Sequence, residues 1–196
     1  MKKTVQEKET LETKNYLVEE TRIKTVNMST DIVHDIGAIV NVRSFDSDKN
    51  PNIASIFNKE LWGFSTRYCK RWNFLRKGVR VLFYGDKGIR IAATVREKHE
   101  SREPVREWAN STGYPYHIIM NFINKQTENT RRITKDELVD VYDIPLAKRG
   151  FRGMALTIFG MNPKEKDGIT YPIEKFNEIW SKFLERNDLH EKPSQT

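Results

Sequence analysis

Two runs of alternating residues around a short turn constrain the fold of this 196-residue chain most strongly. Residues 79–84 read Val-Arg-Val-Leu-Phe-Tyr and residues 89–95 read Ile-Arg-Ile-Ala-Ala-Thr-Val, with Gly-Asp-Lys-Gly between them. Alternation with a period of two across a glycine-containing turn is typical of a β-hairpin. The sequence therefore predicts a hairpin in which Val79, Val81 and Phe83 face the core.

Further strands and helices are expected on both sides of this hairpin. Apolar runs predict strands at 38–42, 117–122 and 155–159. Start signals predict four helices, opened by Asn50-Pro51, by Ser65 or Thr66, by a Thr134/Glu137 capping box and by Pro172. Strands in hairpin-rich order with short helices predict an α+β domain, with a curved sheet or partly open β-barrel flanked by helices.

The chain divides into one domain and its extensions. Residues 1–14 are polar and charged, and they carry too little apolar surface to offset the entropy of ordering. We expect a flexible tail there, an N-terminal extension over 15–35, the domain itself over 36–187 and a second tail over 188–196. With 37% hydrophobic residues, a chain of this length is expected to form one core.

Cysteine usage and hydropathy indicate the setting. Cys69 is the only cysteine, so an internal disulfide is excluded, and no apolar run approaches the roughly 20 residues of a membrane-spanning helix. The four histidines show no spacing typical of a metal site. We therefore expect a cytoplasmic protein with no metal, no cofactor and no membrane partner.

A basic and aromatic segment points to the partner. Residues 61–122 hold three tryptophans and four tyrosines, and residues 67–106 hold twelve Lys or Arg against four Asp or Glu. This local balance of +8 exceeds the net charge of the whole chain, +7. Cations attract phosphates and flat aromatic faces accept unstacked bases, although both residue types also serve solubility and core packing. The predicted contacts to the nucleic-acid backbone are Arg67, Lys70, Arg71, Arg76, Lys77, Arg80 and Arg90.

The ordered motifs resemble a known superfamily. A Pro-capped helix is followed by Leu-Trp-Gly-Phe-Ser at 61–65, a basic helix, Lys-Gly-Val-Arg-Val-Leu-Phe-Tyr at 77–84, a loop with Trp108, and Tyr-Pro-Tyr at 114–116. In this order they resemble the PUA-like superfamily, most closely its EVE and YTH domains. The chain is also similar to the N-terminal DNA-reading modules of McrB-type modification-dependent restriction proteins.

The resemblance implies recognition of a modified, flipped base in an aromatic pocket. By position, Trp62 and Trp108 would form the pocket walls, Ser44 would lie at the edge, and Ser65 and Thr66 would contact base or backbone. Stacking returns about 1 to 3 kcal/mol per base, so two aromatic walls can roughly offset the cost of extruding a base.

The other aromatic residues of the segment have competing interpretations. Tyr114 and Tyr116 are included in the predicted pocket, yet beside a proline they could equally close a strand. Trp72 and Trp180 fit helical stripes, which favours the core.

We expect no enzymatic activity and no catalytic residue. Glu12-Thr13-Lys14, the one string of the nuclease type, falls in the expected tail, and no histidine or acid adjoins Cys69 in the sequence. The first hypothesis is thus a reader of a methylated DNA base that targets a restriction system. Its NTPase motor would be fused or associated, because the chain lacks a P-loop. The alternatives are an RNA-binding PUA-like module and a protein-interaction domain with an acidic partner.

Overall fold

The computed structural model describes residues 35–101, 113–125, 129–151, 154–160 and 171–190. The predicted N-terminal tail, nearly all of the N-terminal extension, residues 191–196 of the predicted C-terminal tail and Trp108 lie outside these residues.

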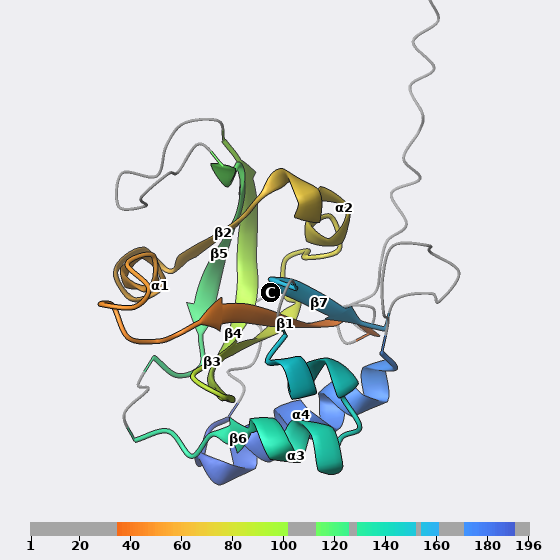
Figure 1. Ribbon diagram of the computed structural model, residues 1–196. Coiled ribbons are helices and arrows are strands. Elements are labelled where there is room, and N and C mark those ends of the chain that lie inside the picture. Colours follow the sequence, from red (N-terminus) through yellow and green to blue (C-terminus); the bar gives the residue numbers. More distant parts are fainter. Residues whose placement is uncertain (1–34, 102–112, 126–128, 152–153, 161–170, 191–196) are drawn as a thin grey trace, which may run out of the picture.

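A curled, half-barrel sheet forms the centre of the fold (Figure 1). Its order is β2-β5-β4-β3-β1-β7, with β6 paired to β4 off this path. β1 and β3 are parallel, and the other pairs are antiparallel. The strands are β1 (Gly37–Arg43), β2 (Leu61–Phe64), β3 (Arg80–Gly85), β4 (Gly88–Glu100), β5 (Tyr116–Phe122), β6 (Ile133–Thr134) and β7 (Leu156–Phe159).

Short helices flank the sheet, which confirms the α+β class. In Figure 1, α1 and α2 lie beside the upper part of the sheet, whereas α3 and α4 lie together below it. The helices are α1 (Ile53–Lys59), the 3₁₀ turn η2 (Thr66–Tyr68), α2 (Cys69–Trp72), α3 (Lys135–Asp140), the 3₁₀ helix η4 (Pro145–Arg149) and α4 (Ile173–Arg186).

The predicted hairpin is confirmed. β3 and β4 pair antiparallel from Arg80 opposite Thr94 to Gly85 opposite Gly88. The two turn residues, Asp86 and Lys87, have φ values of 47° and 66°. Positive φ at both central positions is the geometry of a type I′ turn, whose twist matches that of the strands.

The two faces of the sheet carry separate cores, because side chains alternate along each strand. On β3, Val81 and Phe83 belong to one buried cluster, which includes Trp62 and Trp72. Leu82 belongs to a second cluster, together with the buried residues of α4. We call the first side the α2 face and the second the α4 face.

The capping box and the last helix are confirmed on the α4 face. The Thr134 hydroxyl accepts from the Glu137 backbone N–H, and the Glu137 carboxylate accepts from the Thr134 N–H. The buried residues of α4 follow the predicted stripe: Phe176, Ile179, Trp180 and Phe183.

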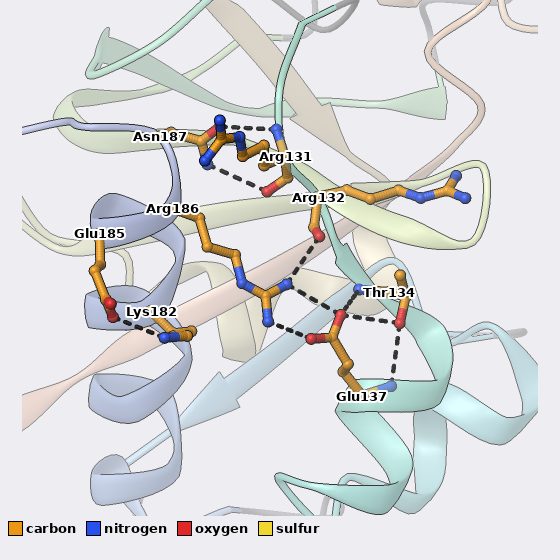
Figure 2. Close-up of polar contacts among 8 residues, drawn as sticks. All are labelled: Arg131, Arg132, Thr134, Glu137, Lys182, Glu185, Arg186 and Asn187. Atoms are coloured by element: carbon orange, nitrogen blue, oxygen red, sulfur yellow. Dashed lines mark hydrogen bonds and ion pairs between the residues drawn. The ribbon is translucent and has the colours of Figure 1, made fainter.

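A charged network ties α3 to α4 (Figure 2). The Arg186 guanidinium donates to both oxygens of Glu137, and its Nη1 also donates to the backbone carbonyl of Arg132 at 3.2 Å. Arg186 hydrogen bonding lowers the pKa of Glu137 from 4.5 to about 2. The two side chains are each only 27% exposed, so this interaction is weakly screened by solvent.

The start of the first helix differs from the prediction. The helix begins at Ile53, with Asn52 rather than Asn50 at its N-cap. The Asn50 amide instead donates to the carbonyls of Val42 and Ser44, at 2.7 and 3.2 Å. It therefore fastens the end of β1, a role that local sequence spacing does not reveal.

Candidate nucleic-acid interface

One end of the α2 face brings together elements that are distant in sequence. Phe64, the last residue of β2, pairs with Tyr116, the first residue of β5. Tyr116 also pairs with Glu100, the last residue of β4. α2 lies at this same end of the sheet in Figure 1. In the sequence, the segment that carries Trp108 follows β4 and precedes β5.

Aromatic rings and a lysine pack closely at this end. The Trp72 indole lies 4.9 Å from the Tyr116 ring, and its Nε1 donates to the His117 carbonyl at 2.9 Å. The Lys98 Nζ lies 4.2 Å from the centre of the Trp72 ring and donates to the Asn73 carbonyl. Burial lowers the pKa of Lys98, and repulsion from Arg76 adds to this effect. Lys98 therefore links β4 to the end of α2, and its side chain remains partly exposed to solvent.

Two histidines stack beside the aromatic rings. The rings of His99 and His117 lie 6.3 Å apart. His117 is buried, and burial lowers its pKa; the nearby His99 lowers it further, whereas a backbone hydrogen bond to Tyr114 acts in the opposite direction. A neutral His117 therefore fits the interior of this site at neutral pH.

Four of the predicted phosphate contacts are exposed on one segment. Residues 66–78 contain five cations and no acidic residue. Along η2, α2 and the turn that follows, the exposed cations are Arg67, Lys70, Arg76 and Lys77. We call these four residues the α2 cations. Exposed cations gathered on one segment attract a polyanion.

The three other predicted phosphate contacts are buried or half-buried. Arg71 donates to the Leu156 carbonyl at 3.0 Å and so ties α2 to β7. Arg90 is half-buried, with its guanidinium 5.9 Å from the Phe45 ring. Arg80 is 9% exposed, and its environment corrects the prediction for this residue.

Arg80 faces helix α4, away from the α2 cations. Its guanidinium carbon lies 5.6 Å from the Phe176 ring and 5.5 Å from the Trp180 ring, and its Nη2 donates to Asn177. Strand alternation explains the error, because Arg80 precedes Val81 and so projects to the opposite face. A side chain enclosed in this way is removed from the surface that phosphates can reach.

Three of the predicted pocket residues, Trp62, Tyr114 and Tyr116, are packed in or against the core cluster of the α2 face. Trp62 is 8% exposed and belongs to the core cluster of this face. Ser44 is buried, and its hydroxyl accepts from the Asp46 N–H at 3.1 Å. Ser44 lies between Val42 and Phe45, which pack in the same cluster as Trp62.

The remaining predicted residues lie at the junction of β2, η2 and β5. Ser65 is the N-cap of η2 and is half-buried, and Thr66 is exposed. Tyr114 and Tyr116 are half-buried and pack against the core cluster of this face. Trp108 lies outside the described residues, so its predicted role as a wall stays a prediction.

Sequence reasoning missed Lys98 as a site residue and assigned Trp72 to the core alone. Trp72 is indeed buried, as predicted, and so is Trp180. Yet Trp72 also organises the site through His117, Tyr116 and Lys98. The sequence places Lys98 near the end of a long predicted strand, and this is the only signal that it offers for the residue. That position brings Lys98 beside α2 only because the strand curves, and local sequence does not show the curvature.

Two kinds of feature are absent from the described residues. Among them, no group of three His, Cys, Asp or Glu side chains could hold a metal ion. None of the described helices combines the length and the apolar character that spanning a bilayer requires.

Comparisons with known proteins give fold-level likenesses only. No protein-family model and no curated protein matches the chain. The chain is similar to the YTH domain-containing protein mmi1, solved as an RNA complex, at 12% identity with a TM-score of 0.46; the match covers 78% of this chain and 87% of that one. It is also similar to the YTH domain of the Zygosaccharomyces rouxii MRB1 protein, solved with N6-methyladenosine RNA, at 13% identity with a TM-score of 0.42, covering 75% and 86%.

Proposed function

We propose that the chain is a non-catalytic module that binds single-stranded nucleic acid across the α2 end of the sheet. The observation that carries the proposal is the adjacency of the α2 cations to the Trp72, Tyr116 and Lys98 cluster. Cations along the path of a nucleic-acid strand neutralise phosphates, and the half-buried Tyr116, rather than the buried Trp72, is the ring of this cluster that would meet an unstacked base.

The finer part of the proposal concerns base recognition. A base modified by a methyl group would stack between Trp62 and Trp108, with Ser44, Ser65 and Thr66 around it and Tyr114 and Tyr116 beside the entrance. Burial of one methyl group contributes about 0.8 kcal/mol, which is only a fourfold preference. Strong selectivity therefore requires a hydrogen-bonding group that the unmodified base leaves unpaired.

RNA is the first ligand to test, and DNA of the same sequence is the second. No described residue favours DNA over RNA or indicates a restriction system with its motor. The proposal therefore drops the restriction role and keeps DNA only as a competing ligand.

The test is fluorescence anisotropy at about 0.15 M salt, where exposed charges are already well screened. RNA and DNA are each titrated unmodified and with N6-methyladenine or 5-methylcytosine. We expect modified RNA to bind most tightly, and Trp108→Ala to remove the preference while most of the salt-dependent binding remains. No binding of any oligonucleotide by the folded chain would overturn the proposal, and equal binding of all would overturn base recognition.

A further inference from the structure

A second cationic site lies on the other side of β3, at the hairpin turn. Six residues line an open hollow with a volume of about 490 Å³: Tyr84, Lys87, Lys135, Lys148, Arg149 and Gly150. Tyr84 belongs to the core cluster of the α4 face, so this hollow is separate from the α2 cations. Its volume lies within the range of small-ligand pockets.

Four cations converge here from three parts of the chain. Lys87 comes from the type I′ turn, Lys135 from the first position of α3, and Lys148 and Arg149 from the end of η4. Within the part of the chain that the structure describes, none of these four side chains takes part in an ion pair. The acidic residue whose charge reaches Tyr84 is Asp136, which is exposed. The hollow thus gathers four cations, with the charge of Asp136 reaching Tyr84 and that of Lys148 acting on Asp143 without a direct ion pair.

The hydroxyl of a largely buried tyrosine lines the same hollow. Tyr84 is only 3% exposed, and its ring packs 4.7 Å from that of Phe151. Among the described residues the Tyr84 hydroxyl makes no hydrogen bond, and it is not one of the fully buried polar atoms, so it can donate to a ligand in the hollow. Burial raises the pKa of Tyr84, with Asp136 contributing, so the hydroxyl keeps its proton and serves as a donor.

The walls of the hollow are fixed before any ligand binds. The Asn41 side-chain amide donates to the carbonyls of Gly150 and Phe151, at 3.2 and 3.1 Å. The Lys135 N–H donates to the Lys87 carbonyl at 2.8 Å, which joins the hairpin turn to α3. Fixed walls lower the entropic cost of binding.

We propose that this hollow binds a phosphate monoester, either of a free nucleotide or of the terminal phosphate of a nucleic-acid strand. A monoester carries about −1.5 to −2 charges at pH 7 and has three acceptor oxygens. It therefore satisfies several cations and the Tyr84 hydroxyl together. A phosphodiester or a carboxylate carries a single negative charge and matches this set less well.

The experiment follows the backbone amides of Lys87, Gly88 and Gly150 by NMR in the full chain. The probes are AMP, adenosine and inorganic phosphate, and an oligonucleotide with a 5′-phosphate compared with the same strand carrying a 5′-hydroxyl. We expect AMP and phosphate to shift these amides and adenosine to leave them unmoved. The oligonucleotide pair identifies the source, because a terminal-phosphate site requires the 5′-phosphate.

Three variants separate binding from folding. Tyr84→Phe retains the packed ring and should weaken AMP binding severalfold, whereas Lys148→Gln should weaken it about tenfold, the scale of one charge-assisted hydrogen bond. Lys87→Asn removes a cation at a position with positive φ, and asparagine tolerates this backbone conformation. AMP binding should therefore weaken without a loss of protein stability. Lys182→Gln is the charge-matched control, because Lys182 pairs with Glu185 on α4.

The proposal is overturned if millimolar AMP leaves the three amides unmoved, or if the variants bind AMP as tightly as the control does. Neither result affects the proposed function, since oligonucleotides with 5′-hydroxyl ends test the α2 cations without this hollow.

Discussion

The two faces of the sheet use arginine in opposite ways. On the α4 face, Arg80 is buried and Arg186 is half-buried, and their partners are Asn177, two aromatic rings and Glu137. On the α2 face, Arg67 and Arg76 are exposed on a segment without an acidic residue. Arg80 and Arg186 on the first face hold helices to the rest of the fold, whereas Arg67 and Arg76 on the second present their side chains to solvent. Total charge alone therefore does not locate a binding surface.

The most severe test of this contrast is Arg80→Ala. We expect it to lower the free energy of unfolding by about 3 kcal/mol, because packing against two rings and a buried hydrogen bond are lost together. Binding of nucleic acid by the folded fraction should not change. Arg76→Ala is the matched variant, expected to change stability by less than about 0.5 kcal/mol and to weaken binding. Urea unfolding and anisotropy measure both quantities, and the reverse assignment of effects would break the comparison.

A second prediction concerns acid. The pKa of Glu137 is lowered from 4.5 to about 2 in the folded chain, so its stabilising effect is complete above pH 4.5 and is lost as the pH falls toward 2. We expect about 2 kcal/mol of stability to be lost over this range.

Glu137→Gln should flatten this pH dependence, because a glutamine can keep the capping bond but cannot titrate. The control is Glu185→Gln, which removes an exposed pair with Lys182 and should keep the pH dependence of stability of the unchanged chain. Urea unfolding at several pH values measures the effect, and an equally steep loss in the Glu137 variant would refute this role.

The third prediction sharpens the contrast on the α2 face. The double variant Arg76→Gln with Lys77→Gln should make the plot of the logarithm of the binding constant against the logarithm of the salt concentration less steep by about 1.4. Each phosphate contact to a single strand contributes about 0.7 to this slope. The control is Lys182→Gln with Lys175→Gln, two cations of α4 with acidic partners. An equal change in slope for both double variants would show that the two faces are not distinct.

The smallest effect is expected at the hairpin turn. Lys87 has a φ of 66°, where a lysine is strained and asparagine is tolerated. Lys87→Asn should therefore raise the free energy of unfolding by about 0.5 kcal/mol. Lys148→Asn, at the end of η4, is the charge-matched control and should give no such gain; a destabilised Lys87→Asn would contradict the turn assignment.

Sequence patterns correctly predict the helices and turns that depend on residues close together in the sequence. The hairpin, the capping box at Thr134 and the stripe of α4 all depend on spacings of a few residues, and all three are confirmed. β2 was missed because its four residues are too few to show a period.

The site was predictable only in outline, because its geometry depends on contacts between distant segments. The segment around α2 was identified correctly as basic, yet the burial of Arg80 follows from packing against a helix almost one hundred positions later. Likewise, Lys98 meets Trp72 only because β4 curves past α2. The roles of Trp62 and Trp108 as walls stay predictions.

Chemical-shift mapping of the full chain with a single-stranded RNA bearing a 5′-hydroxyl tests the division of the two faces most directly. The account predicts that the largest amide shifts fall between Thr66 and Lys77 and between Tyr114 and His117, with the amides of α4 unmoved. Shifts concentrated on α4, or spread evenly over both faces, would contradict it.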